Sequence, residues 1–189
     1  MNNKAVITST VGYMCLALTG WLLSMPNAGW FDRLYEHGVA MMLATAFVLG
    51  VMGILAFLSE RALDAVIFFG GAGLFWSGHA YLGSSASGAD PGHYSGWYFF
   101  IWAVYFCYVW LGSFRAGLDR MLFLLGLWLT LLALAIGDWS ALRAITVLGG
   151  YLGLATSILA AIISATAVIA YGFSGSDIGH LKGTTKAGA

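Results

Sequence analysis

The chain has 189 residues, of which 60% are hydrophobic and only 8% are charged, and its formal net charge is zero. A soluble domain carries about 25% charged residues, so this chain cannot build the charged surface that such a domain needs. The balanced charge gives no basis for nucleic-acid binding. The composition therefore predicts a membrane protein.

Six long apolar runs fill almost the whole chain. Each is close to or longer than the roughly 20 residues that a helix needs to cross about 30 Å of hydrocarbon. We therefore predict an all-α, polytopic membrane protein whose transmembrane domain covers residues 1–173, followed by a disordered cytoplasmic tail over 174–189. In chain order, the predicted spans are 7–25, 37–58, 62–82, 96–114, 119–136 and 142–173.

The basic residues of the loops predict the orientation. Arg33 and Arg143 fall on one side of the predicted spans, and the other six basic residues fall on the opposite side. The positive-inside rule places the side with six in the cytoplasm, and an even number of spans then places both termini there. We predict a multi-pass protein of the inner membrane. The six residues are Lys4, Arg61, Arg115, Arg120, Lys182 and Lys186.

Two glycine-rich stretches lie within predicted helices. Gly149 and Gly153 have the small-residue spacing that lets two helix backbones approach closely. This face packs either inside the protomer or against a neighbouring copy, and we interpret it as support for a homo-oligomer. The stretch Gly70-Gly71-Ala72-Gly73 either packs closely on another helix or lines a water-filled cavity.

No ionisable side chain lies near the middle of a predicted span. Proton-driven carriers usually keep a carboxylate or a histidine at depth, because a site must hold and release the proton. The pattern favours a channel, or a carrier whose substrate brings its own proton, as a weak acid does. The sequence contains no HExxH, GxSxG, P-loop or CxxC motif, so we predict no catalytic residue and no enzyme activity.

Several potential metal ligands lie toward the outer face. Such side chains could hold a metal ion or a haem. Histidines at similar depth also arise by chance and suit the membrane interface, so we predict no metal and no other cofactor. The residues concerned are Glu36, His37, His79, Asp90 and His93.

Short motifs along the chain occur in the order and spacing of a known family. They are Gly12-Tyr13-Met14, Leu22-Leu23, Asn27-Ala28-Gly29-Trp30-Phe31, Gly73-x-Phe75-Trp76, Leu111-Gly112-Ser113-Phe114-Arg115, Ala135-Ile136-Gly137-Asp138 and Gly149-Gly150-Tyr151-Leu152-Gly153. Through these motifs the chain resembles the acetate uptake transporter family, the succinate–acetate permeases, over about residues 11–171. The resemblance implies six helices around a pore in each protomer and a homohexameric assembly.

The resemblance also implies positions for the pore. The family's narrowing phenylalanine, tyrosine and leucine match Leu16, Ala72 and Leu127, and a pore-facing glutamine matches Gly53. We therefore predict an apolar constriction at the first three positions, with Gly53 lining the pore. Each hydroxyl near it could equally bond back to its own helix. The polar candidates for solute contact are Thr19, Ser77, His79 and Thr130.

Three functions remain open at this stage. The first is a channel or permease for small monocarboxylates such as acetate, with succinate as a further candidate, passing the protonated acid or an acid accompanied by a proton. The second is a channel for a small neutral solute such as urea, ammonia or carbon dioxide, because two rings and the glutamine of the family pore are replaced. The third is a non-transporting accessory subunit of a membrane complex. The expected partners are the solute, membrane lipid and other copies of the chain.

Overall fold

The computed structural model describes residues 3–31, 36–85 and 94–181, with side chains described over 6–31, 38–80 and 94–172. These residues form six α-helices and a short 3-10 turn, η1 (Ser113–Arg115), and contain no strand. The helices are α1 (Asn3–Asn27), α2 (Glu36–Leu58), α3 (Ala62–Ser85), α4 (Tyr94–Gly112), α5 (Leu118–Ser140) and α6 (Arg143–Leu181). The prediction of an all-α chain is confirmed.

Five helices of the described residues are long and apolar enough to cross a membrane. The stretches are Val6–Asn27, Gly38–Leu58, Tyr94–Arg115, Leu118–Ser140 and Arg143–Gly172. Their outward faces carry large exposed apolar side chains such as Phe47, Phe57 and Ile101, which suit a surrounding of lipid rather than water. The chain is therefore a multi-pass membrane protein. That α3 also crosses the bilayer remains a prediction.

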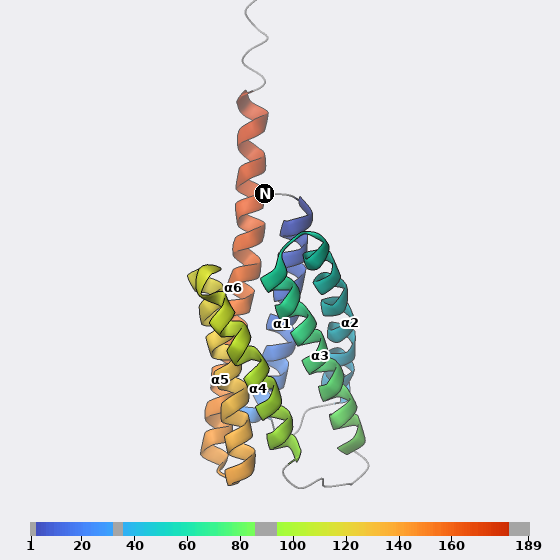
Figure 1. Cartoon of the computed structure of the whole chain (residues 1–189), viewed down its shortest axis with the longest axis vertical. Helices are drawn as coiled ribbons and strands as arrows, with labels where there is room; N and C mark the ends of the chain where they lie inside the picture. Colours follow the sequence, from blue (N-terminus) through green and yellow to red (C-terminus); the bar gives the residue numbers. More distant parts are fainter. Residues whose placement is uncertain (1–2, 32–35, 86–93, 182–189) are drawn as a thin grey trace, which may run out of the picture.

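The six helices form a closed ring (Figure 1). Each helix packs against its neighbours along the chain, α3 and α4 less closely than the others, and α6 returns to pack along α1. The start of α1 and the end of α6 lie at one end of the bundle, which we call the terminal end. The opposite end, with the turn between α5 and α6, is called the far end.

The tight turns between helices depend on left-handed backbone conformations. Glu60 has φ 58° between α2 and α3, and Ala141 has φ 54° between α5 and α6. Gly117, with φ 111°, precedes α5, where a residue with a Cβ would be strained. These turns bring consecutive helices side by side as antiparallel pairs.

The last helix differs from its prediction. α6 continues past Phe173 to Leu181, so the first part of the predicted disordered tail is helical. Extending an existing helix requires no new nucleation, and this explains how a polar, glycine-containing segment can continue the helix. Residues 182–189 of the predicted tail lie outside the described residues.

The small-residue face of α6 packs inside the chain. A Cβ added at Gly149 would lie 3.0 Å from a methyl carbon of Leu134 on α5, and one at Gly150 would lie 2.5 Å from the carbonyl carbon of Asn27 on α1. Among the two open alternatives, the structure thus supports packing within the protomer. The face gives no argument for contact with a neighbouring copy.

The glycine-rich stretch of α3 is also used for packing. A Cβ at Gly73 would lie 2.7 Å from the Trp102 ring of α4, and one at Gly71 would lie 2.9 Å from Leu16 of α1. Neither glycine lies among the residues that line the central cavity. Close approach of α3 to its neighbours accounts for these residues.

Candidate functional site

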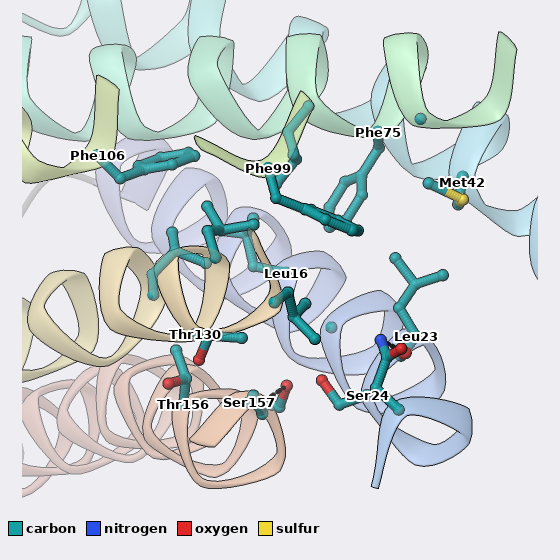
Figure 2. Close-up of a pocket in the computed structure, with 18 of the residues that line it drawn as sticks. Leu16, Leu23, Ser24, Met42, Phe75, Phe99, Phe106, Thr130, Thr156 and Ser157 are labelled. Carbon is teal, nitrogen blue, oxygen red and sulfur yellow. Dashed lines mark hydrogen bonds between the residues drawn. The ribbon is translucent and has the colours of Figure 1, made fainter. Parts of the chain in front are cut away.

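The ring of helices encloses one central cavity of about 220 Å³, lined by residues from all six helices (Figure 2). A water molecule in the liquid occupies about 30 Å³, so the space suits several waters or one small organic solute. Along α1 the lining runs from Leu16 at mid-helix to Asn27 at its last residue. The cavity therefore occupies the half of the bundle nearer the far end.

One wall of the cavity is apolar. It includes Phe75 of α3, Phe99 and Phe106 of α4, and Met42 of α2, with Leu16 of α1 between this wall and the opposite one. Phe106 is fully buried. These side chains offer the solute hydrocarbon, ring and thioether surface.

The opposite wall carries hydroxyl groups (Figure 2). Thr130 of α5, Thr156 and Ser157 of α6, and Ser24 of α1 all line the cavity and are buried. The lining residues, all of them described, include no aspartate, glutamate, lysine, arginine or histidine. The polarity of the site comes from neutral groups.

Three of these hydroxyls already donate a hydrogen bond to a backbone carbonyl of their own helix. Thr130 Oγ1 donates to the carbonyl of Gly126 at 2.7 Å, Thr156 Oγ1 to Leu152 at 2.8 Å, and Ser157 Oγ to Gly153 at 2.8 Å. A hydroxyl has one proton and two lone pairs, so each oxygen keeps only acceptor capacity for a solute. This wall favours a solute that donates hydrogen bonds.

Ser24 differs from these three residues. Its side chain is 7% exposed and lines the cavity. Its hydroxyl has no hydrogen-bond partner among the described side chains and backbone groups. Its proton is therefore available to a solute that accepts a hydrogen bond.

Close packing of α1 on α6 positions the hydroxyl wall. A Cβ at Gly20 of α1 would lie 2.7 Å from Ser157 Oγ, and a Cβ at Gly153 of α6 would overlap Ser24 Oγ. Each serine of one helix thus sits against a glycine of the other. The glycines allow the two serines to lie at the edge of the cavity.

The predicted site residues fall into two groups. Leu16, Leu127 and Thr130 line the cavity, whereas Ala72 is not among the lining residues. Gly53 faces α3 instead, since a Cβ there would lie 2.9 Å from the Phe69 ring. The structure does not bring all these positions to one space.

The other polar candidates are engaged between helices. Thr19 and Thr45 join α1 to α2 through hydroxyls 2.7 Å apart, and His79 Nδ1 lies 2.9 Å from the Val39 carbonyl oxygen. Ser77 donates to the carbonyl of Gly73 at 2.6 Å. None of the three predicted candidates lines the cavity. The side chains of Glu36, His37, Asp90 and His93 lie outside the described residues.

Sequence reasoning missed three hydroxyl residues, four phenylalanines and a tyrosine that line the cavity. They are Ser24, Thr156, Ser157, Phe75, Phe99, Phe106, Phe123 and Tyr98. In the last helix, hydroxyl residues lie beside small residues, and this pattern is compatible with a polar wall. Which of these hydroxyls face the cavity depends on how α6 is aligned along α1.

Six helices closed around one central cavity, with apolar outer faces, define the fold of a polytopic membrane protein. The solved structure of the bacterial acetate channel SatP matches this chain with a TM-score of 0.84, over 92% of this chain and 96% of that chain, at 21% sequence identity. No family model and no curated protein sequence matches the chain. The likeness confirms the all-helical membrane fold that the resemblance implies, and a pore in each protomer remains a prediction.

Proposed function

We propose that this protein is a membrane channel for small monocarboxylic acids such as acetic acid, and that they cross in the uncharged form. The observation that carries the proposal is the uncharged cavity with an acceptor-lined wall. A protonated acid donates one hydrogen bond, which Thr130, Thr156 or Ser157 can accept. Its carbonyl oxygen accepts one, which Ser24 can donate.

A carboxylate anion fits this cavity poorly. It needs donors, and a charged group at the bilayer centre costs at least about 2.5 kcal/mol even on the most favourable scales. An uncharged acid avoids that cost and still satisfies the hydroxyl wall. The likeness to an acetate channel supports the same solute class.

A small neutral solute is a second candidate. Urea and ammonia carry N–H groups, and the three hydroxyl oxygens that only accept suit such donors. This candidate differs from the first in one measurable way, because urea does not titrate in the physiological range. Carbon dioxide lacks donors and gains nothing from the wall.

The placement in the membrane follows the loop charges. In the proposal the terminal end is cytoplasmic, both termini are inside, all six helices cross the inner membrane, and each protomer has its own pore. Leu16 and Leu127, which line the cavity from α1 and α5, form the apolar constriction there. Ala72 supports this constriction in the proposal by packing against the hydrophobic core beside the cavity. The family resemblance supports a homohexamer.

The test is solute flux into proteoliposomes. With a carboxyl pKa near 4.3, the neutral fraction of an acid falls about 80-fold between pH 5 and pH 7. Uptake of labelled acetate should fall by a similar factor, urea uptake should not change with pH, and succinate provides a larger comparison solute. Acetate flux that is equal at both pH values would rule out passage of the uncharged acid.

A matched pair of variants connects the flux to the wall. Thr130→Val removes a cavity oxygen and should reduce acetate uptake at pH 5 about tenfold, the effect of roughly 1.4 kcal/mol. Thr166→Val makes the same change on an exposed part of α6 and should leave uptake unchanged. If the unmodified protein passes no small solute, the accessory-subunit function is favoured instead.

A further inference from the structure

Three aromatic rings in edge-on contact lie at the terminal end of the cavity. Tyr13 of α1 contacts Phe68 of α3, with ring centroids 5.3 Å apart, and Phe123 of α5, with centroids 5.6 Å apart. Both contacts are edge-on, at 72° and 83°. We call these residues the ring cluster.

The ring cluster borders the cavity on the side of the terminal end. Phe123 belongs to both, because it lines the cavity and contacts Tyr13. Tyr13 precedes the lining residue Leu16 by three positions, so both share one face of α1. On α1 and α5 no described residue closer to the terminal end than Leu16 and Phe123 lines the cavity. A solute that moves toward the terminal end along α1 and α5 therefore meets these rings.

The ring cluster is tightly packed. Tyr13 and Phe68 are each fully buried. A Cβ added at Gly12 would lie 2.5 Å from Cε1 and 2.8 Å from Cε2 of the Phe68 ring. The ring of α3 thus rests directly on the backbone of α1, and these two helices leave no gap at this point.

A buried carboxylate holds the tyrosine in place. The Tyr13 hydroxyl donates to Asp64 Oδ1 at 3.1 Å, and Asp64 is 1% exposed. Two guanidinium groups neutralise this carboxylate: Arg61 forms a salt bridge with Oδ2, and Arg120 Nε lies 3.4 Å from Oδ1. Asp64 thus links the ring cluster to the α2–α3 turn and to the first turn of α5.

The bonds in this network differ in strength. Separating a buried carboxylate from both arginines leaves charges without partners and is strongly unfavourable. A single hydrogen bond from a neutral tyrosine is lost more easily. The tyrosine is therefore the part of the network that can move while the ion pairs stay intact.

We propose that Tyr13, Phe68 and Phe123 form a gate at the terminal end of the pore, held shut by the hydrogen bond from Tyr13 to the Asp64–Arg61–Arg120 cluster. The gate opens when the Tyr13 ring rotates away from both phenylalanines and its hydroxyl leaves Asp64. This inference rests on the proposed function for its role in transport. The barrier itself can be measured without any flux.

The test is thiol accessibility at the cavity floor. Cys15 and Cys107 are replaced by alanine, and Leu16→Cys places a thiol above the gate. A separate Glu60→Cys variant marks the side, because Glu60 is exposed in the α2–α3 turn next to Arg61. A membrane-impermeant methanethiosulfonate reagent is then applied to sealed vesicles from the side on which Glu60→Cys reacts. That marker fixes the side without assuming a topology.

The gate predicts slow modification of Leu16→Cys from that side. Tyr13→Ala should raise the rate strongly, and Tyr13→Phe, which keeps the ring and removes only the hydroxyl, should raise it about tenfold. Tyr105→Phe makes the same chemical change outside the cavity and should have no effect. If Tyr13→Ala does not fold, Tyr13→Phe decides the outcome.

Two results would overturn the gate. One is modification of Leu16→Cys as fast as Glu60→Cys in the parent protein. The other is an unchanged rate in a folded Tyr13→Phe variant. Acetate flux is recorded in parallel: a Tyr13-dependent barrier in a protein that passes no solute would retain the gate and reject the proposed function.

Discussion

The contact between α1 and α6 predicts a large effect for a very small substitution. Gly150 of α6 lies against the last residues of α1, and a Cβ there would lie 2.5 Å from the Asn27 carbonyl carbon and 2.7 Å from Ala28 Cα. Both are backbone atoms, which cannot rotate away as a side chain can. Gly150→Ala should therefore force the two helices apart.

The magnitude follows from the two opposing terms. Ordinary contact between carbon atoms needs about 3.5 Å, so the helices must separate by roughly 1 Å at this point. Overpacking of this kind costs about 1–3 kcal/mol, whereas replacing a helical glycine by alanine gains at most about 1 kcal/mol. We expect a net loss of about 1–2 kcal/mol, which lowers Tm by roughly 2–8 °C in a protein of this size.

The assay is thermal unfolding of the purified protein in detergent, followed by circular dichroism. Gly50→Ala of α2 is the matched control, because a Cβ there meets nothing within 4 Å. It should leave Tm unchanged or raise it slightly. If Gly150→Ala is as stable as Gly50→Ala, α1 and α6 do not approach as closely as described, and the position of the hydroxyl wall also becomes doubtful.

Three further predictions follow from other contacts. Asp64→Asn should lower Tm more than Glu60→Gln. The first change leaves two arginines beside a buried neutral group, a loss of about 3 kcal/mol or more, whereas Glu60 is exposed. Equal Tm values would show that the cluster does not stabilise the fold. Asp138→Ala removes the carboxylate that accepts from the Gly96 N–H at 2.8 Å and from the Ser95 hydroxyl at 2.6 Å. It should cost about 1 kcal/mol as a lost helix cap, measured by the same unfolding assay, and an unchanged Tm would argue against the cap. Glu60→Cys and Ala141→Cys, both exposed in turns at opposite ends, should react with an impermeant thiol reagent from opposite sides of the membrane, and reaction from the same side would contradict the topology.

The helices were predictable because their signal is local. Continuous apolar runs fix where a membrane helix can lie, and charged or glycine-containing turns such as the one at Gly117 end them. The end of α6 was missed for the opposite reason. Its last residues are polar, and they stay helical because the helix already exists before them.

The hydroxyl wall could be predicted only in part. Thr130 was among the predicted polar candidates, three residues from Leu127 on the same helix, and it lines the cavity. Ser24 and Ser157 come from helices at opposite ends of the sequence, and their place depends on the register of α1 against α6. No local pattern in either helix specifies that register.

Asp64 shows the same limit for a charged residue. It lies near the start of the predicted span 62–82, where a carboxylate would normally meet water. The structure buries it, and its partners Tyr13 and Arg120 come from α1 and α5. A charge can be buried only where such partners converge, so its burial could not be inferred before the ring of helices was known.

The polar groups of the cavity thus differ in chemistry from those at the terminal end of the bundle. Within the cavity the hydroxyls are neutral and their protons are mostly committed to their own helices, so an uncharged solute meets acceptors without a trapping charge. At the terminal end, Asp64, Arg61 and Arg120 form a charged cluster, and the Tyr13 and Phe123 rings lie between this cluster and the cavity. An unshielded Arg61 or Arg120 would bind a carboxylate and hold it. In the proposed channel, keeping these cations occupied by Asp64 behind the rings would serve release of the solute as well as closure of the pore.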